Sequence, residues 1–578
     1  MHDLTSPSGA VAIAIMGSGG AGAITAGGLL LEAAGRAGWH GLMTRSVGPQ
    51  IRGGEALAMV RLATAPVSAH GDRFDLLLAL DWENAERFVD ETPLDADSLI
   101  VADPAAGEPP AALRASGARV LPLPLDRLAK GVPEGRANIV ALGALARWLA
   151  LPLEPLEAVV VRALARKGAN AAHLRQALAV GHDAAAAGNG FQRPLPPVPG
   201  DGARWLLTGN EATALGALRG GARFAAIYPI TPATDLAEWL APRLPEVGGQ
   251  LIQAEDEIAA INMALGASYG GVPALTATSG PGLALMTETL GLAVAAEIPV
   301  VVVDVMRGGP STGIPTKSEQ SDLNIALYGL HGDAPHLVLA PISVGDCLFA
   351  TQWAVRLAEA LQCPAIVLSD QFLGQTQAVC DPPPADPAPA ARTTAPVNGE
   401  RYHRYALTAN SVSPMAIPGM PGQQYTADGL EHNPHGTPSS RAADHQAQLD
   451  KRRDKLLRHD YGSAWAEVAG EGGIAVLTWG STAGPVWEAA ARARAQGLAV
   501  RAIALRLLAP AQPARLAALL AGVQRVLVVE QSHSRQFLGY LRAHYPLPAD
   551  VQVINQPGPL PIRPAAVLAR LSQWKRRV

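Results

Sequence analysis

Val11–Gly22 reads VAIAIMGSGGAG, and residues 24–38 continue as ITAGGLLLEAAGRAG. An uninterrupted apolar run of this length is typical of a buried strand, and the glycines that follow it predict a tight turn. The second stretch has the composition of a helix that packs against a core. The order of strand, glycine turn and helix indicates an α/β fold, in which helices cover a largely parallel sheet.

The same alternation of apolar runs and helical stretches recurs along all 578 residues. We therefore predict an α/β protein with three doubly wound domains, over residues 1–190, 206–378 and 469–578. A proline-rich linker at 191–205 and an extended connecting segment at 379–468 are predicted to join them.

The composition excludes several classes of protein. The chain is 48% hydrophobic and 17% charged with a net charge of −4, which gives no basic surplus for nucleic acid. Cys347, Cys363 and Cys380 form no CxxC pair, so we expect neither a metal or iron–sulfur site within this chain nor a disulfide framework. Residues 4–31 are uncharged, but their glycines and the lack of a basic start favour a soluble loop over a signal peptide or membrane span. A reducing cytoplasm is the expected location.

The glycine turn itself has two interpretations. Gly17–Gly22 fits G-x-G-x-x-G, a loop that can present backbone N–H groups to phosphate. The region where a dinucleotide site usually has its ribose-binding acid contains Arg45 and Arg52, with no acid before Glu55. NAD is therefore disfavoured and NADP stays a weaker alternative. A tight turn without any ligand is as open as a loop that binds some other phosphate ligand.

The stretch IYPITPATD at 227–235 places Thr231 between two prolines at the end of an apolar run. Proline fixes its own φ and restricts the residue before it, so Thr231 has little backbone freedom. One interpretation is an ordinary strand-to-helix turn, with Thr234 or Asp235 as the N-cap. The other is that the turn holds the Thr231 hydroxyl in place for function.

Three further features follow predicted strands. The acidic Glu255–Glu257 starts a helix, which favours the helix dipole, although one glutamate could instead hydrogen-bond a heterocycle nitrogen. TATSGPG at 276–282 has the small residues that let a ligand approach the backbone. Arg307 ends a buried run, where α/β sheets bind ligands, and its guanidinium suits a carboxylate. A salt bridge from Arg307 to Asp304 is the alternative.

Taken together, these stretches resemble the 2-oxoacid:ferredoxin oxidoreductases, in their α-type catalytic subunit. The residues that carry the resemblance are GNEATALGAL (209–218), YPITPATD (228–235), QAEDEIAAINMALGASYGG (253–271), ATSGPGLALMTE (277–288) and DVMRGGPSTGIPTKSEQSDL (304–323).

The remaining parts of the chain resemble the same family, so that the resemblance covers nearly the whole sequence. The glycine loop and GPQIRGGEA (48–56) resemble a γ domain fused ahead of α, as in the 2-oxoglutarate-type two-subunit enzymes. SPMAIPGMPGQQYTADGLEHNPHGTPS (413–439) also matches that group. The three predicted domains then correspond to a γ-type domain, a pyrimidine-binding domain for thiamine diphosphate and a transketolase-C-like domain.

The resemblance implies oxidative decarboxylation of 2-oxoglutarate with coenzyme A to succinyl-CoA and CO2. It implies a β subunit that shares the thiamine diphosphate, carries Mg2+ and a [4Fe-4S] cluster, and passes electrons to ferredoxin, in an (αβ)2 assembly. Gly200–Gly202 reads GDG, the start of the metal motif of thiamine enzymes, but the asparagine pair that should follow is missing, so that motif is assigned to the partner. The same chemistry on pyruvate or a branched 2-oxoacid stays open, as does a non-catalytic NADP-binding or scaffolding subunit.

Residue roles also follow from the resemblance. Glu257 corresponds to the glutamate that hydrogen-bonds N1′ of the aminopyrimidine, Thr231 to a substrate-side hydroxyl, and Arg307 to the clamp on the 1-carboxylate. Further cofactor contacts are expected from Tyr228, Pro229, Ile230, Ser279 and Gly280. A distal substrate group is expected to meet Thr312, Thr316 and Lys317. Coenzyme A is expected to meet Gly17, Gly19, Gly20, Gly22 and Arg52. Many relatives have serine where this chain has Ala233, which weakens any analogy about the substrate.

Overall fold

A computed structural model of the chain describes residues 9–47, 54–186, 193–198, 204–314, 316–385, 391–396 and 402–575. The chain forms two compact units. Unit 1 comprises Met1–Thr208, Gln375–Pro383 and Ile562–Val578, and unit 2 comprises Gly209–Gly374 and Pro384–Pro561. Within the residues that the structure describes, no helix is both long and apolar enough to cross a membrane.

Unit 1 is built on one eight-stranded sheet with the order β6-β5-β4-β1-β3-β2-β14-β7. Its strands are β1 (Ala10–Gly17), β2 (His40–Val47), β3 (Ala56–Ala63), β4 (Leu76–Ala79), β5 (Leu99–Ala102), β6 (Arg119–Pro122), β7 (Trp205–Thr208) and β14 (Gln377–Cys380). Strands β1, β4, β5 and β6 are parallel, whereas β3, β2, β14 and β7 pair antiparallel. The predicted α/β class is confirmed, with a mixed sheet.

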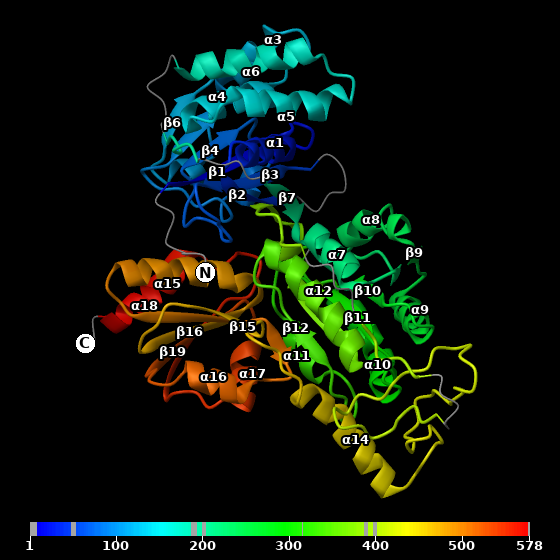
Figure 1. The fold of residues 1–578 in the computed structure, drawn as a ribbon. Coiled ribbons are helices and arrows are strands. Elements are labelled where there is room, and N and C mark those ends of the chain that lie inside the picture. The colour runs from blue at the N-terminus through cyan, green and yellow to red at the C-terminus, as the bar shows by residue number, and fades with distance from the viewer. Residues whose placement is uncertain are drawn as a thin grey trace. The chain divides into compact units, whose positions relative to one another are not determined.

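Helices cover this sheet because both of its faces are apolar. In β1, Val11, Ile13 and Ile15 pack into one core with the helices, and the alternate residues face a second, smaller core. Figure 1 shows α4, α5 and α6 stacked beyond α1. The helices of unit 1 are α1 (Ala23–Arg36), α2 (Ala111–Arg114), α3 (Leu125–Lys130), α4 (Ala137–Leu149), α5 (Leu153–Ala165), α6 (Ala171–Ala186) and α18 (Pro564–Lys575).

Unit 2 contains two sheets that share one hydrophobic core. The seven-stranded sheet has the order β18-β12-β13-β11-β10-β8-β9, and only β18 within it runs antiparallel. The five-stranded sheet has the order β15-β17-β16-β19-β20, with β15 antiparallel. The strands are β8 (Phe224–Ile227), β9 (Gln250–Gln253), β10 (Ala274–Thr278), β11 (Val300–Met306), β12 (Leu337–Leu339), β13 (Pro364–Asp370), β15 (Ala466–Ala469), β16 (Ile474–Trp479), β17 (Val500–Leu505), β18 (Leu507–Ala509), β19 (Arg525–Glu530) and β20 (Asp550–Asn555).

The helices that follow these strands complete the α/β layers of unit 2. Helices α7 and α12 pack closely against each other, because Gly216 lets the Leu348 backbone approach. The bounds are α7 (Gly209–Gly220), α8 (Thr234–Leu240), α9 (Glu257–Tyr269), α10 (Gly280–Ala295), α11 (Leu323–Tyr328), α12 (Val344–Leu361), α13 (Gln371–Gln375), α14 (Ala442–Leu457), α15 (Ala483–Ala495), α16 (Pro513–Leu519) and α17 (Gln536–His544).

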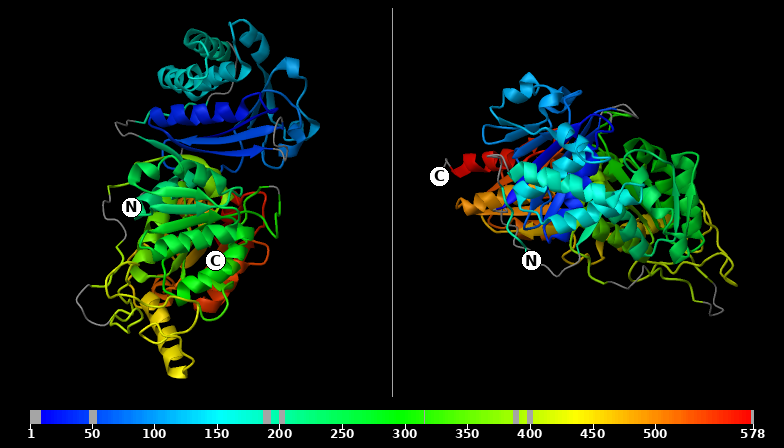
Figure 2. Two further views of the ribbon diagram at one scale, coloured as in Figure 1. Left: turned by 90° about the vertical axis from the view of Figure 1, so that its right-hand side faces the viewer. Right: turned by 90° about the horizontal axis from the view of Figure 1, so that it is seen from above.

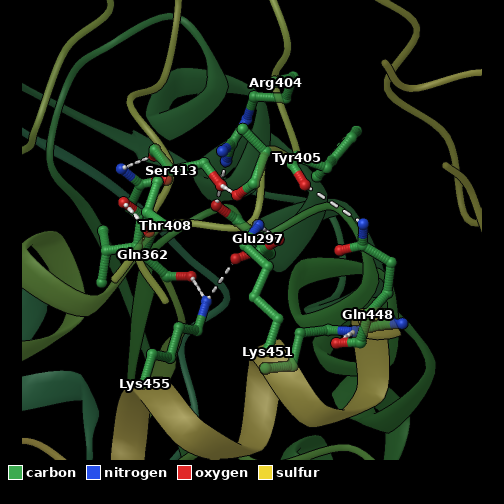
Figure 3. Close-up of polar contacts among 12 residues, drawn as sticks. Glu297, Gln362, Arg404, Tyr405, Thr408, Ser413, Gln448, Lys451 and Lys455 are labelled. Carbon is green, nitrogen blue, oxygen red and sulfur yellow. Dashed lines mark hydrogen bonds and ion pairs between the residues drawn. The ribbon is translucent and has the colours of Figure 1, made fainter. Parts of the chain in front are cut away.

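A buried ion network fixes α14, yellow in Figure 2, to the rest of unit 2. Lys451 and Lys455 point from α14 toward Glu297, just beyond the end of α10, and their Nζ atoms lie 2.6 and 2.9 Å from its carboxylate oxygens (Figure 3). The three side chains are no more than 2% exposed. Arg404, fully buried, donates to the Glu297 carbonyl at 2.8 Å. The two lysines hold the pKa of the Glu297 carboxyl well below its usual range, against the effect of burial.

Candidate active site

Four neighbouring strands of the seven-stranded sheet end beside one another. Strands β9, β8, β10 and β11 are adjacent and parallel, so the segments after them leave the sheet at the same edge. Those segments contain Glu257, Thr231, Ser279 and Arg307. The carboxyl edge of a parallel sheet is where α/β folds bind ligands. The topology therefore brings together residues that lie up to 76 positions apart in the sequence.

The buried side-chain amide of Asn210 holds the turn after β8. Nδ2 of Asn210, on α7, donates to the Pro232 carbonyl at 2.8 Å, and Thr231 is exposed beside it. The strand-to-helix turn is confirmed. The predicted N-cap is wrong, because α8 starts at Thr234 and its N-cap is Ala233, which has no capping side chain. The amides of residues 233 and 234 donate instead to the Ile230 carbonyl, so the backbone itself begins the helix.

Arg307 reaches from the end of β11 to this turn. Its Nη1 donates to the Thr231 carbonyl at 2.8 Å. The alternative of a salt bridge to Asp304 is wrong, since both carboxylate oxygens of Asp304 are buried without a hydrogen-bond partner among the described residues. Residues three apart in an extended strand point to opposite faces, which separates these two side chains. The structure thus brings Arg307 and Thr231 together.

Glu257 is the first residue of α9. The two acidic residues at this helix start, Asp256 and Glu257, have different roles. Asp256 is the N-cap and accepts from the Ala259 amide at 2.7 Å, while Glu257 is only 7% exposed. A Cβ on Gly282 would overlap Oγ1 of Thr278 and lie 2.9 Å from Oε1 of Glu257. The β10–α10 turn therefore needs glycine here to let the Glu257 carboxylate approach.

The same turn offers a second polar group and a second glycine. Oγ of Ser279 is buried and, among the described residues, has no hydrogen-bond partner. A Cβ on Gly280 would lie 2.6 and 2.7 Å from the two carboxylate oxygens of Asp322. Glycine is therefore required at position 280, because the Asp322 carboxylate occupies the space that a side chain would take.

The loop after β11 folds back on its own start. The Gly308 amide donates to the Lys317 carbonyl at 2.8 Å, which places the Lys317 backbone next to Arg307. Thr312 lies on the exposed part of this loop, and Thr316 adopts a positive φ of 37°. Of the three residues expected to meet a distal substrate group, Lys317 is joined through its backbone carbonyl to Gly308, the residue after Arg307.

Sequence reasoning missed Asn210 and Asp322, although both lie in quoted motifs. Their contacts, to Pro232 and Gly280, join positions that are far apart in the chain, so only the fold reveals them. Burial, then the Glu319 charge, raise the pKa of Asp322 to about 6, while the Arg307 charge opposes them. Burial, then the charge of Asp322, raise the pKa of Asp304 well above its ordinary value.

In unit 1, the predicted glycine loop joins β1 to α1. Gly20 and Gly22 adopt φ of 103° and 89°, and Gly17 and Gly19 flank Ser18. Ser18 donates through its amide at 2.9 Å and through Oγ at 2.7 Å to Asp81, which follows β4. An acid therefore does lie at this loop, supplied by the strand next to β1 and not by the region near Arg45. Arg52 and the GDG at 200–202 lie outside the described residues.

Comparisons with known proteins agree with this organisation. Family models described as "Pyruvate flavodoxin/ferredoxin oxidoreductase, thiamine diP-bdg" and "Pyruvate ferredoxin/flavodoxin oxidoreductase" match residues 215–451 and 12–184. The 2-oxoglutarate oxidoreductase subunit KorA of Mycobacterium tuberculosis is 36% identical over 72% of this chain and 65% of its own length. Subunit alpha of the 2-oxoacid:ferredoxin oxidoreductase 2 of Aeropyrum pernix is 33% identical, over 76% of this chain and 74% of that relative.

A solved structure matches over almost the full length. It is the 2-oxoglutarate:ferredoxin oxidoreductase from Magnetococcus marinus with 2-oxoglutarate, coenzyme A and succinyl-CoA bound. The TM-score is 0.91 at 36% sequence identity, over 98% of this chain and 99% of that chain. The resemblance seen in the sequence is confirmed, and this chain belongs to the 2-oxoacid:ferredoxin oxidoreductase family, as an α-type subunit with the family's thiamine diphosphate-binding domain.

Proposed function

We propose that this chain is the α subunit of a 2-oxoglutarate:ferredoxin oxidoreductase. The reaction is the oxidative decarboxylation of 2-oxoglutarate with coenzyme A, which gives succinyl-CoA and CO2. The observation that carries the proposal is that the segments containing Glu257, Thr231 and Arg307 leave the sheet at one edge, where Arg307 contacts Thr231. The choice of 2-oxoglutarate is supported by the ligands of the Magnetococcus marinus enzyme and by the name of the Mycobacterium tuberculosis relative.

The residues at this edge fit the aminopyrimidine of thiamine diphosphate. A nearly buried carboxylate, Glu257, stands beside a glycine-lined turn, and the buried Ser279 hydroxyl has no partner among the described residues. The cofactor, when bound, supplies the electron sink for decarboxylation. Glu257 is the residue that would hydrogen-bond the ring nitrogen. The remaining contacts are assigned to Tyr228, Pro229, Ile230, Ser279 and Gly280.

The substrate side of the site is assigned to the residues after β8 and β11. Arg307 binds the 1-carboxylate, since a guanidinium can donate two parallel hydrogen bonds to a carboxylate. Thr231 lies on a turn that Asn210 and Arg307 both hold through backbone carbonyls, and its hydroxyl is assigned to orienting the substrate before reaction. Thr312, Thr316 and Lys317 are assigned to the distal carboxylate.

The rest of the reaction requires partners. A β subunit with the diphosphate-binding domain, Mg2+ and a [4Fe-4S] cluster passes electrons to ferredoxin, and two αβ units form an (αβ)2 assembly. Coenzyme A is assigned to the glycine loop of unit 1, through Gly17, Gly19, Gly20 and Gly22, and to Arg52.

The test uses the complex of this chain with its β partner, under anaerobic conditions. Reduction of a viologen dye is followed with coenzyme A and either 2-oxoglutarate or pyruvate. Glu257→Ala should abolish the reduction, whereas Glu255→Ala, an exposed neighbour on the same turn, should leave it unchanged. A preference for pyruvate would overturn the assignment of 2-oxoglutarate as the substrate. Full activity of Glu257→Ala would overturn the assignment of the site.

A further inference from the structure

Three carboxyl groups come from β11 and from the segment that follows the Arg307 loop. Asp304 lies on β11, Glu319 and Asp322 lie on the segment that follows the Arg307 loop, and a Cβ on Gly308 would be 3.2 Å from Oε2 of Glu319. Among the described residues, none of these acids forms an ion pair with Arg307, whose Nη1 is bound by the Thr231 carbonyl and whose Nε is buried without a partner. The guanidinium therefore keeps donors for an anion that arrives from outside.

Asp322 is the acid in this group with the most defined position. Its carboxylate lies against Cα of Gly280, at the turn that also contacts Glu257 through Gly282. Gln536 of α17 holds the backbone on both sides of it, because Nε2 donates to the Ser321 carbonyl at 2.8 Å and Oε1 accepts from the Asn324 amide at 2.9 Å. Oδ2 of Asp322 is buried and has no hydrogen-bond partner among the described residues. Asp322 is thus fixed in place without being neutralised.

Gln320 anchors the same segment further upstream. Its Nε2 donates to the Trp479 carbonyl at 3.0 Å, and its Oε1 accepts from the Gln531 amide at 2.8 Å. Glutamine side chains do not titrate, so this anchoring is independent of pH. A change in the charge of Asp322 therefore acts on Arg307 while the segment stays in place.

Three charged groups influence Asp322. Glu319 raises the pKa of Asp322 and Arg307 lowers it, while the charges of Asp304, on β11, and Asp322 repel each other. His533 lowers the pKa of Glu319, the carboxyl that precedes Asp322 on the same segment. Burial is the largest influence, and together these effects raise the pKa of Asp322 to about 6. A further anion bound at Arg307 would disfavour the charged form of Asp322 still more, because like charges repel in a partly buried site.

We propose that Asp322 is a positioning residue that couples binding of the substrate's 1-carboxylate at Arg307 to the uptake of one proton by Asp322. In the free protein the Asp322 charge attracts the guanidinium, and on binding the substrate carboxylate takes over this role. The proton comes from solvent and is released when the carboxylate leaves, so no redox partner is involved. This inference rests on the proposed function through the assignment of Arg307.

The test measures protons and affinity in the αβ complex. Calorimetric titration with 2-oxoglutarate at pH 7, in two buffers of different ionisation enthalpy, gives the number of protons taken up. The Glu257→Ala background prevents turnover during the titration. We expect net proton uptake with Glu257→Ala, and none when Asp322→Asn is added. We also expect the KM of the wild type for 2-oxoglutarate to rise severalfold from pH 5.5 to 8, and that of Asp322→Asn to stay flat and low.

Two control variants separate this role from a purely structural one. Gln536→Ala removes the anchor beside Asp322, so it should raise KM at every pH without changing the pH dependence. Asp333→Asn removes an exposed acid further along the chain and should change neither quantity. Thermal unfolding of Asp322→Asn at pH 7 should occur at a temperature no lower than that of the wild type. Asparagine keeps the shape that packs on Gly280 and removes a charge that burial disfavours.

The outcomes distinguish this inference from the proposed function. Binding of 2-oxoglutarate without proton uptake overturns the role of Asp322 and leaves the proposed function intact. An unchanged KM profile in Asp322→Asn does the same. If the complex turns over only pyruvate, the substrate proposal fails, and the titration with pyruvate asks the same question of its carboxylate. If neither acid binds, the Arg307 assignment and this inference are both overturned.

Discussion

The guanidinium of Arg307 donates a hydrogen bond to the backbone carbonyl of Thr231, 2.8 Å away, so that the end of β11 holds the turn after β8. Two residues that are 76 positions apart in the chain are thereby set side by side at the candidate active site. Nη1 of Arg307 donates this bond, and the other N–H groups of the guanidinium can donate to a ligand.

Arg307→Lys should weaken binding of the 2-oxoacid much more than it slows turnover at saturation. Lysine keeps the charge but loses the planar fork and the fixed contact with Thr231. Hydrogen bonds to charged groups contribute about 1.5–3 kcal/mol, which corresponds to a rise in KM of roughly ten- to a hundredfold. Steady-state kinetics of the αβ complex would show this. Equal losses in kcat and kcat/KM would place Arg307 in the chemical step and not in substrate binding.

Gly282→Ala should damage both the site and the fold of unit 2. The added methyl group would overlap Oγ1 of Thr278 and press on the Glu257 carboxylate. Overpacking of this kind costs about 1–3 kcal/mol, and displacement of Glu257 should remove most of the activity. Denaturant unfolding and the viologen assay would measure the two effects.

The matched control for this variant is Gly266→Ala, in the middle of α9, where an added Cβ meets nothing within 4 Å. It should stabilise the helix by roughly 0.5–1 kcal/mol without loss of activity, because alanine is the better helix former. Gly282→Ala with unchanged activity would contradict the close approach of Glu257 to this turn.

Glu297→Gln should be among the most destabilising single changes in unit 2. It would leave Lys451 and Lys455 buried without a counter-charge, and breaking a buried ion pair from one side costs about 3–5 kcal/mol. The shift of the urea midpoint of unit 2 would measure this. Asp454→Asn, which removes the partner of the exposed Arg458, should cost less than about 1 kcal/mol. Similar effects of the two changes would show that the network contributes little.

The stability of unit 2 should fall in acid because of the same carboxylate. The pKa of Glu297 is lowered in the folded protein, so its contribution is fully present above the ordinary value of 4.5 and is lost as pH falls further. Lys451, whose pKa is lowered to about 8, gives a second slope of the same sign at alkaline pH, because the unfolded chain binds more protons there, and stability gains as pH rises from 8 toward 10.5. Urea unfolding over this pH range would reveal both slopes. The acid slope should be reduced in Glu297→Gln, and an unchanged acid slope there would assign it to another group. The alkaline slope should instead begin at a lower pH, because Glu297 raises the pKa of Lys451.

The sequence predicted the α/β class and the positions of the site segments, because these depend on local patterns. A buried strand, a glycine turn and a helix are visible in Val11–Arg36, and the motifs around Thr231, Glu257 and Arg307 were specific enough to indicate the family. The antiparallel pairing of β2 and β3 was not visible, nor was the entry of β18 into the seven-stranded sheet. Strand partners are chosen by packing across long sequence separations, which local patterns do not encode.

The sequence by itself therefore determined which chemical groups this protein brings to its site, and the tertiary structure decided which of them touch. Arg307 contacts the Thr231 carbonyl and not the nearer-in-sequence Asp304, because the strand directs Asp304 into the core. Asp322 reaches Gly280, and Asp81 reaches the glycine loop, only because parallel strands bring their carboxyl ends to one edge. The residue types are a property of the sequence, whereas burial, mutual charge and the resulting pKa values arise from contacts that exist only in the folded chain.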